Sequence, residues 1–274
     1  MDKSIEKIPS QIRRDILRMV HAVQSGHPGG SLGCTEFFVA LYFKILNHDK
    51  ESFNMNGQNE DIFFLSNGHI SPVFYSVLAR AGYFSIGELS TFRKLNSRLQ
   101  GHPTTHEGLP GVRIASGSLG QGLSVALGAA EAKKLSDDNN LVFSLHGDGE
   151  LQEGQTWEAI LSASSWKMDN LCLVVDYNNM QVEGSVDQVM SLEPLIDKFL
   201  SFGWNTISCN GNKITELLDS FNKARNCSNR PSVIIAKTLV GKGVDFLEGQ
   251  LSHNLTFPQE IAKKALISLE NFYE

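Results

Sequence analysis

Two short apolar runs separated by a helical segment constrain the fold of this chain more than any other feature. Residues 141–146 (LVFSLH) and 171–176 (LCLVVD) have the length and composition of buried strands, and residues 155–166 have the apolar spacing of a helix. A strand, helix, strand unit folds as a right-handed crossover, so the two strands are parallel. The loops that follow both strands therefore emerge at the same carboxyl edge of the sheet, where open α/β sheets bind ligands.

Both of these loops carry oxygen donors. The run from His146 to Glu150 (HGDGE) follows the first strand, and Asn178 in VVDYNNMQVEG follows the second. Carboxylate, amide and carbonyl oxygens suit Mg²⁺ or Ca²⁺, and Mg²⁺ prefers a few protein oxygens together with phosphate oxygens. Gly147 and Gly149 would let the backbone approach a phosphate. Either loop alone is also an ordinary turn, but together they predict a site for a metal and a diphosphate.

Helices and strands alternate along the rest of the chain. The predicted helices are residues 9–24, 34–46, 71–83, 118–135, 213–226 and 257–274, and further strands are predicted in residues 61–68, 202–209 and 231–243. Residues 85–115 are polar and rich in Gly, Pro and His, which predicts an ordered functional loop. The alternation predicts an α/β fold with a mostly parallel sheet and helices on both faces. No repeat or linker divides the 274 residues, so we expect one domain over residues 1–274.

The charge and cysteine content argue against several classes of partner. The net charge of −6 and the absence of a Lys/Arg cluster argue against nucleic acid and against anionic membranes.

The first twenty residues have scattered charges and lack the apolar core of a signal peptide, so we expect a soluble, cytoplasmic protein. The four cysteines have no C-x-x-C spacing, which favours reduced thiols: Cys34, Cys172, Cys209 and Cys227.

Other cofactor sites fit the sequence poorly. No G-x-G-x-x-G opens a helix and no G-x-x-x-x-G-K-[ST] is present, which disfavours a dinucleotide site and a P-loop. A catalytic zinc site is disfavoured because no H-E-x-x-H accompanies the eight histidines. Several histidines nevertheless stand in Gly- or Pro-bearing loops. A lone loop histidine is usually a surface residue, but a cluster of imidazoles suits a site that moves protons on sugar hydroxyls.

Six motifs in one order carry a family resemblance. They are GDGELQEGQTWEA, VVDYNNMQVEG, SGHPGGSLG (25–33), LSNGHISP (65–72), GHPTTHEGLPGV (101–112) and GSLGQGLSVALG (117–128). With these motifs the chain resembles the amino-terminal part of transketolase over roughly residues 10 to 255. The resemblance implies the thiamine diphosphate-binding fold, with its diphosphate-binding (PP) domain, and thiamine diphosphate as cofactor.

The resemblance also implies a set of cofactor ligands. The divalent metal, Mg²⁺ or else Ca²⁺ or Mn²⁺, would be held by Asp148, Asn178 and the backbone carbonyl of Met180. The diphosphate and the thiazolium ring would be contacted by His69, Gly117, Leu119, Gly149, Asn178 and Val182. Asn178 could instead be a turn residue, and ordinary packing would explain Leu119 and Val182 nearly as well.

By the same resemblance, His27, His69 and His102 match active-site histidines that contact the donor ketose or the diphosphate. His253 matches a further one less closely, because Asn254 follows it where glycine is usual. The remaining loop and helix histidines keep the surface interpretation: His21, His48 and His106.

Glu153 has two interpretations. An acidic residue at a helix start is favourable against the helix dipole. In transketolases the matching glutamate joins a carboxylate network that crosses the subunit interface and supports cofactor activation. We therefore expect His27, His102, His253 and Glu153 to be the catalytic residues.

In the family, a pyrimidine-binding domain and a carboxyl-terminal domain follow the diphosphate-binding domain, and this chain ends at Glu274. The resemblance therefore implies the amino-terminal subunit of a split transketolase. Such a chain would be inactive alone, and the assembled enzyme would act on sugar phosphates. It would form a heterotetramer with a second copy of itself and two copies of a carboxyl-terminal subunit. Four alternatives remain open: a deoxyxylulose phosphate synthase, the α-subunit of a 2-oxo acid dehydrogenase, a split transketolase for an unusual sugar, and a non-catalytic subunit.

Overall fold

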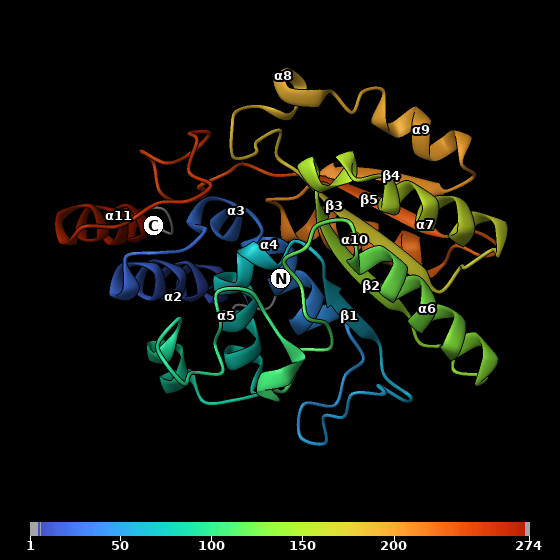
Figure 1. The fold of residues 1–274 in the computed structure, drawn as a ribbon, viewed down its shortest axis with the longest axis horizontal. Helices are drawn as coiled ribbons and strands as arrows, with labels where there is room; N and C mark the ends of the chain where they lie inside the picture. Colours follow the sequence, from blue (N-terminus) through green and yellow to red (C-terminus); the bar gives the residue numbers. More distant parts are fainter. Residues whose placement is uncertain (1–4, 6, 272–274) are drawn as a thin grey trace.

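The computed structural model describes residue 5 and residues 7–271. Five parallel strands form one sheet in the order β1-β2-β3-β5-β4 (Figure 1). The strands are β1 (Ile62–Leu65), β2 (Val142–Gly147), β3 (Leu171–Tyr177), β4 (Asn205–Asn210) and β5 (Ser232–Lys237). The parallel pairing of β2 with β3, which was expected from the crossover between them, is confirmed.

Both faces of the sheet are apolar because alternate residues of the buried strands point to opposite sides. In β3, Cys172 and Val174 belong to one core, whereas Leu173 and Val175 belong to the other. The first core is covered by α2 (Ile8–Val23), α4 (Thr35–Ala40), α5 (Ser71–Ala81), α10 (Ile214–Arg225) and α11 (Gln259–Asn271). The second core is covered by α6 (Gly122–Leu135), α7 (Gly154–Ser165) and α9 (Leu195–Ser201), and Figure 1 shows α6 and α7 on the side of the sheet away from α2 and α5. The predicted α/β class with helices on both faces is confirmed.

Some local structure differs from the sequence prediction. The glycine-rich segment after the first predicted helix, residues 9–24, forms a short helix of its own, α3 (Pro28–Gly33). Proline in the first turn fits a helix start, and the glycines let the α3 backbone approach the chain near Ser252 and Leu239. Helix α4 continues directly into a π-helical turn, Leu41–Ile45. Two further helices in the described part of the chain were not predicted, namely α8 (Val186–Met190) and α9.

The loops that leave the carboxyl ends of β1, β2, β3 and β5 meet at one edge of the sheet, as parallel pairing requires. Residues 85–115 form a long connection with two 3₁₀ turns, Ile86–Thr91 and Thr105–Glu107. No helix in the described part of the chain is both long enough and apolar enough to cross a membrane.

Candidate functional site

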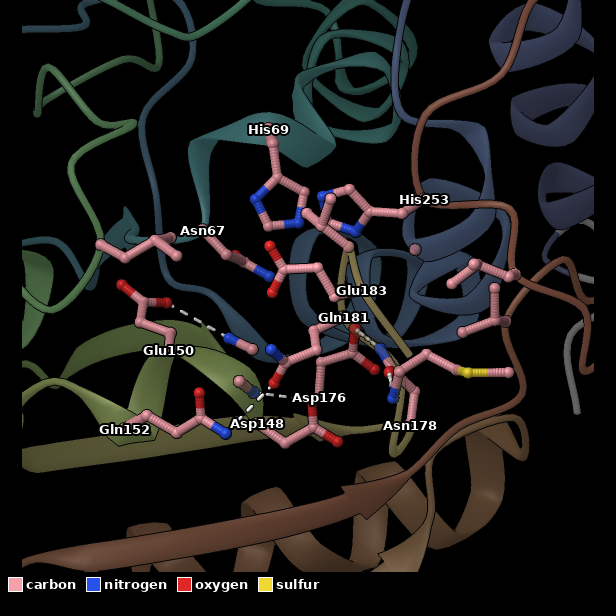
Figure 2. A pocket seen from close by; sticks show the side chains of 18 of the residues that line it. Asn67, His69, Asp148, Glu150, Gln152, Asp176, Asn178, Gln181, Glu183 and His253 are labelled. Atoms are coloured by element: carbon pink, nitrogen blue, oxygen red, sulfur yellow. Dashed lines mark hydrogen bonds between the residues drawn. The ribbon is translucent and has the colours of Figure 1, made fainter. Parts of the chain in front are cut away.

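A cavity of about 330 Å³ opens at the carboxyl edge of the sheet. The loops after β1, β2 and β3 line it, and so does the segment around His253. Figure 2 shows Asp148, Asp176 and Asn178 on one side of this cavity and the imidazoles of His69 and His253 on the other. The predicted meeting of the two loops after β2 and β3 therefore forms one wall of a ligand-sized cavity.

The carboxyl group of Asp148 joins these two loops. The residue is 1% exposed, and its carboxylate accepts hydrogen bonds from the backbone amides of Gly149 (2.8 Å) and Asn179 (2.5 Å). The Asp148 amide in turn donates to the backbone carbonyl of Asp176 (3.1 Å). Burial, followed by the nearby charge of Asp176, raises the pKa of Asp148 to about 7. A cation beside this carboxylate would oppose both effects.

A second buried carboxyl group lies beside the first. Asp176 ends β3, is 2% exposed, and accepts hydrogen bonds from the Asn178 side-chain amide (2.8 Å) and from the Thr238 hydroxyl. Burial raises the pKa of Asp176. The Asn178 amide oxygen accepts from the Met180 backbone amide (2.8 Å), and this oxygen keeps a second lone pair for a ligand. Within the described residues, neither Asp148 nor Asp176 forms an ion pair with a basic side chain.

This donor set fits a hard divalent cation. Carboxylate, amide and carbonyl oxygens of Asp148, Asn178 and Met180 all belong to residues that line the cavity. Among the described residues, no group of three or more His, Cys, Asp or Glu side chains forms a metal site. An ion held here would therefore need the amide and carbonyl oxygens, and it would take its remaining ligands from phosphate or water.

Four histidines from four separate segments of the chain form a cluster, and two of them, His69 and His253, line the cavity. The ring centroid of His27 lies 5.3 Å from His69, 6.1 Å from His102 and 5.0 Å from His253, and His69 lies 4.8 Å from His253. Burial is the largest cause that lowers the pKa of His27 to about 4 and of His69 to about 3. Burial also lowers the pKa of His102 and His253. The cluster is therefore a set of neutral imidazoles near pH 7, each able to donate and to accept a hydrogen bond.

The histidines with a surface interpretation lie outside this cluster. His106 is exposed, and His21 Nδ1 lies 2.5 Å from the carbonyl oxygen of Phe257. His48 Nδ1 lies 2.6 Å from the Tyr83 hydroxyl oxygen.

Most of the other residues predicted from the sequence to contact the cofactor or to act in catalysis also lie at the cavity. Leu119, Gly149, Glu153 and Val182 line the cavity, and Val182 is 62% exposed. Gly117 does not line it, but a Cβ atom there would lie 3.2 Å from the His102 ring. Glu153 is exposed at the N-cap position of α7 and at the cavity wall, so both of its interpretations fit its position.

Sequence reasoning missed two buried carboxyl groups that shape the site, Glu150 and Asp176. The Glu150 carboxylate is buried and accepts hydrogen bonds from the Ser66 hydroxyl (2.5 Å) and from the amides of Gly120 (2.8 Å) and Gly147 (3.2 Å). These bonds tie together the loops after β1 and β2 and the start of α6. Asp176 was likewise missed as a site residue, although an acidic residue in an otherwise apolar strand is a signal that it has a polar partner.

The fold and the cavity together define an α/β protein with a ligand-sized cavity at the carboxyl edge of a parallel sheet, the edge where open α/β sheets bind ligands. The family model described as "Transketolase, thiamine diphosphate binding domain" matches residues 5–260. The chain belongs to the transketolase family, which confirms the resemblance seen in the sequence motifs.

Curated relatives of two lengths match the chain. A 6-deoxy-6-sulfo-D-fructose transketolase subunit from Clostridium sp. is 37% identical, with 94% of each chain covered. One of the subunits of an apulose-4-phosphate transketolase from Actinobacillus succinogenes is 37% identical over 90% of this chain and 88% of the relative. Human transketolase is 33% identical over 96% of this chain, but the match covers only 42% of the human protein.

Solved transketolase structures also match nearly the whole chain. Transketolase from Campylobacter jejuni is 35% identical with a TM-score of 0.89, and the match covers 98% of this chain and 43% of that one. The Pichia stipitis transketolase complex with sedoheptulose 7-phosphate is 26% identical, with a TM-score of 0.86 over 98% of this chain and 44% of that one. The chain thus spans less than half the length of the solved transketolases.

Proposed function

We propose that this chain is the diphosphate-binding subunit of a two-chain transketolase, which moves a two-carbon ketol unit from a ketose to an aldose. The observation that carries the proposal is the cavity in which buried Asp148 lies opposite His69 and His253, two members of the cluster of four histidines. Two relatives that are named as subunits match over nearly their whole length, which supports a division of the enzyme into two chains.

Asp148, Asn178 and the carbonyl of Met180 would hold a divalent cation, with Mg²⁺ as our first choice. The Gly149 amide would donate to a phosphate oxygen, since a glycine there leaves room for the diphosphate. Bound thiamine diphosphate supplies the nucleophilic carbon that allows the ketose to be cleaved beside its carbonyl group. The chain's own contribution is to anchor and orient that group.

The histidine cluster would handle the protons of the sugar. Because His27, His102 and His253 are neutral near pH 7, each can accept a proton from a sugar hydroxyl or donate a hydrogen bond to its oxygen. His69 lines the cavity that would hold the cofactor, so we assign it to the diphosphate side.

The second chain would supply the pyrimidine-binding and carboxyl-terminal domains, and Glu153 is exposed where a partner could reach it. We propose two copies of each chain in the assembly. The substrates we propose are ketose and aldose phosphates. A less common sugar is a second candidate, because the two subunit relatives are named for 6-deoxy-6-sulfo-D-fructose and apulose 4-phosphate.

Reconstitution with the candidate carboxyl-terminal chain tests the proposal. We expect ketol transfer from a ketose phosphate to an aldose phosphate when both chains, thiamine diphosphate and Mg²⁺ are present, and no transfer when either chain is omitted. Turnover by this chain alone would contradict the division of the enzyme into two chains. Consumption of a 2-oxo acid other than hydroxypyruvate, with loss of CO₂ and without any ketose donor, would favour the synthase and dehydrogenase alternatives.

A further inference from the structure

A second, more open pocket of about 710 Å³ lies beside the histidine cluster. Its polar lining comes from the long 85–115 connection and from the loop after α2: Ser25, Arg93, Gln100, His102, Thr104 and Glu107. The proposed function gives a role only to His102 among these residues. The remaining five supply hydrogen-bond donors and acceptors that the cofactor does not need.

The histidine cluster lies between the two pockets. His69 and His253 line the first cavity, and His102 lines the second. His27 lies between them, with its ring centroid 5.3 Å from His69, 5.0 Å from His253 and 6.1 Å from His102. A substrate whose reacting carbon sits at the first cavity would therefore extend past His27 into the second pocket.

The surroundings of Arg93 hold its guanidinium group at the wall of this pocket. Its backbone has φ +55°, a left-handed conformation that costs a non-glycine residue about 1–2 kcal/mol. Nη1 donates to the Ser25 hydroxyl (2.7 Å), whereas Nε is buried and has no hydrogen-bond partner among the described residues. A Cβ atom on residue 101 would lie 2.8 Å from the guanidinium carbon, so Gly101 leaves the space that Arg93 occupies.

The lining also indicates what kind of ligand would fit. A guanidinium group offers five N–H donors and no acceptor, whereas the Glu107 carboxylate offers only acceptors when ionised. Gln100 and Thr104 can do both. A ligand with several hydroxyl groups satisfies all four residues, because each hydroxyl both donates and accepts. A ligand group that carries only negative charge would be repelled by the Glu107 carboxylate and could not donate a hydrogen bond to it.

We propose that Arg93, with Gln100, Thr104 and Glu107, forms a subsite for the hydroxyl-bearing carbon chain of the sugar beyond its reacting carbons. The subsite would give this chain its own part in substrate selection. This inference rests on the proposed function, since it takes the reacting end of the sugar to lie at the cofactor cavity.

The test compares two donors in the reconstituted two-chain enzyme. A ketose phosphate carries hydroxyl groups that reach the subsite, whereas hydroxypyruvate has only three carbons and does not. For Arg93→Met we expect the KM of the ketose phosphate to rise about 10- to 100-fold, the effect of losing a hydrogen bond to a charged group. We expect kcat/KM for hydroxypyruvate to stay within about twofold. The matched control is Arg98→Met, because Arg98 belongs to the same connection but pairs with Glu88 outside the pocket.

The outcomes separate this inference from the proposed function. An equal loss with both donors, or an unchanged KM for the ketose phosphate, would overturn the subsite. Should Arg93→Met fail to fold, Arg93→Lys keeps the charge without the planar fork, and it should raise the ketose KM while hydroxypyruvate turnover persists. Wild-type enzyme that turns over neither donor would refute the proposed function, and with it the subsite.

Discussion

At the residue scale, burial keeps the histidine cluster uncharged, and this couples stability to pH. Because the pKa of His27 falls to about 4 in the folded chain and returns to about 6.5 on unfolding, protons favour the unfolded state. The contribution of neutral His27 is complete above pH 6.5 and is lost as the pH falls towards 4. Lowering the pH from 7 to 4.5 should destabilise both proteins. We predict that the loss of stability is about 1 kcal/mol smaller in His27→Asn than in wild type, a figure discounted for the partial exposure of His27.

Urea unfolding of the isolated chain at the two pH values measures this difference. His106→Asn is the matched control, since His106 is an exposed histidine outside the cluster. An identical loss of stability in wild type and His27→Asn would show that the cluster does not resist protonation.

The two interpretations of Glu153 also separate at the residue scale. If its carboxylate only complements the dipole of α7, Glu153→Gln costs at most about 1 kcal/mol of stability and leaves turnover intact. Our account predicts that turnover of the reconstituted enzyme falls at least about tenfold, while unfolding of the isolated chain changes by less than about 1 kcal/mol. Glu158→Gln, on the exposed face of α7, should leave turnover near the wild-type rate. Wild-type turnover of Glu153→Gln would leave only the dipole interpretation.

Residue types and motif order were enough to select Asp148, Asn178 and the four histidines as candidates, but their surroundings were not predictable. Asp176 and Glu150 are buried because neighbouring loops supply their hydrogen-bond donors, Thr238 in one case and Ser66 in the other. Those donors are separated from their acceptors by 62 and 84 positions, so only the folded chain reveals the pairs.

At the element scale, short helix α3 holds the segment that carries His253. The Gly29 amide donates to the Ser252 carbonyl (3.1 Å), and a Cβ atom on Gly29 would lie only 2.6 Å from that same oxygen. We predict that Gly29→Ala destabilises the chain by about 1–3 kcal/mol, because backbone must move to admit the methyl group.

Thermal or urea unfolding checks this value against a second glycine-to-alanine change. Gly128 lies within α6, where a Cβ atom meets nothing within 4 Å, so Gly128→Ala should raise stability by about 0.5–1 kcal/mol. Similar effects at the two positions would contradict the role given to the α3 contact.

The same elements show where sequence patterns fail. Long amphipathic helices such as α2 and α10 were predicted to within about two residues, because periodic apolar positions mark them. Helices α8 and α9 have only 5 and 7 residues, too few for a helical period to emerge. Helix α3 is glycine-rich, so local propensity opposes it, and its contacts with residues 239–252 decide its conformation.

At the scale of the whole molecule, the parallel sheet is what assembles the site. Loops from four strands reach one edge, and no single loop holds enough donors for a metal and a diphosphate. We therefore propose that Asp148 and the oxygens beside it bind a divalent cation that anchors the cofactor.

Calorimetric titration of the two-chain assembly with thiamine diphosphate measures this anchoring, once with Mg²⁺ present and once with a chelator in place of Mg²⁺. We predict binding that requires the divalent cation and that weakens at least about 100-fold in Asp148→Asn, whereas exposed Asp219→Asn binds as wild type does. Equal affinity in Asp148→Asn and wild type, or binding that is indifferent to the cation, would contradict the account.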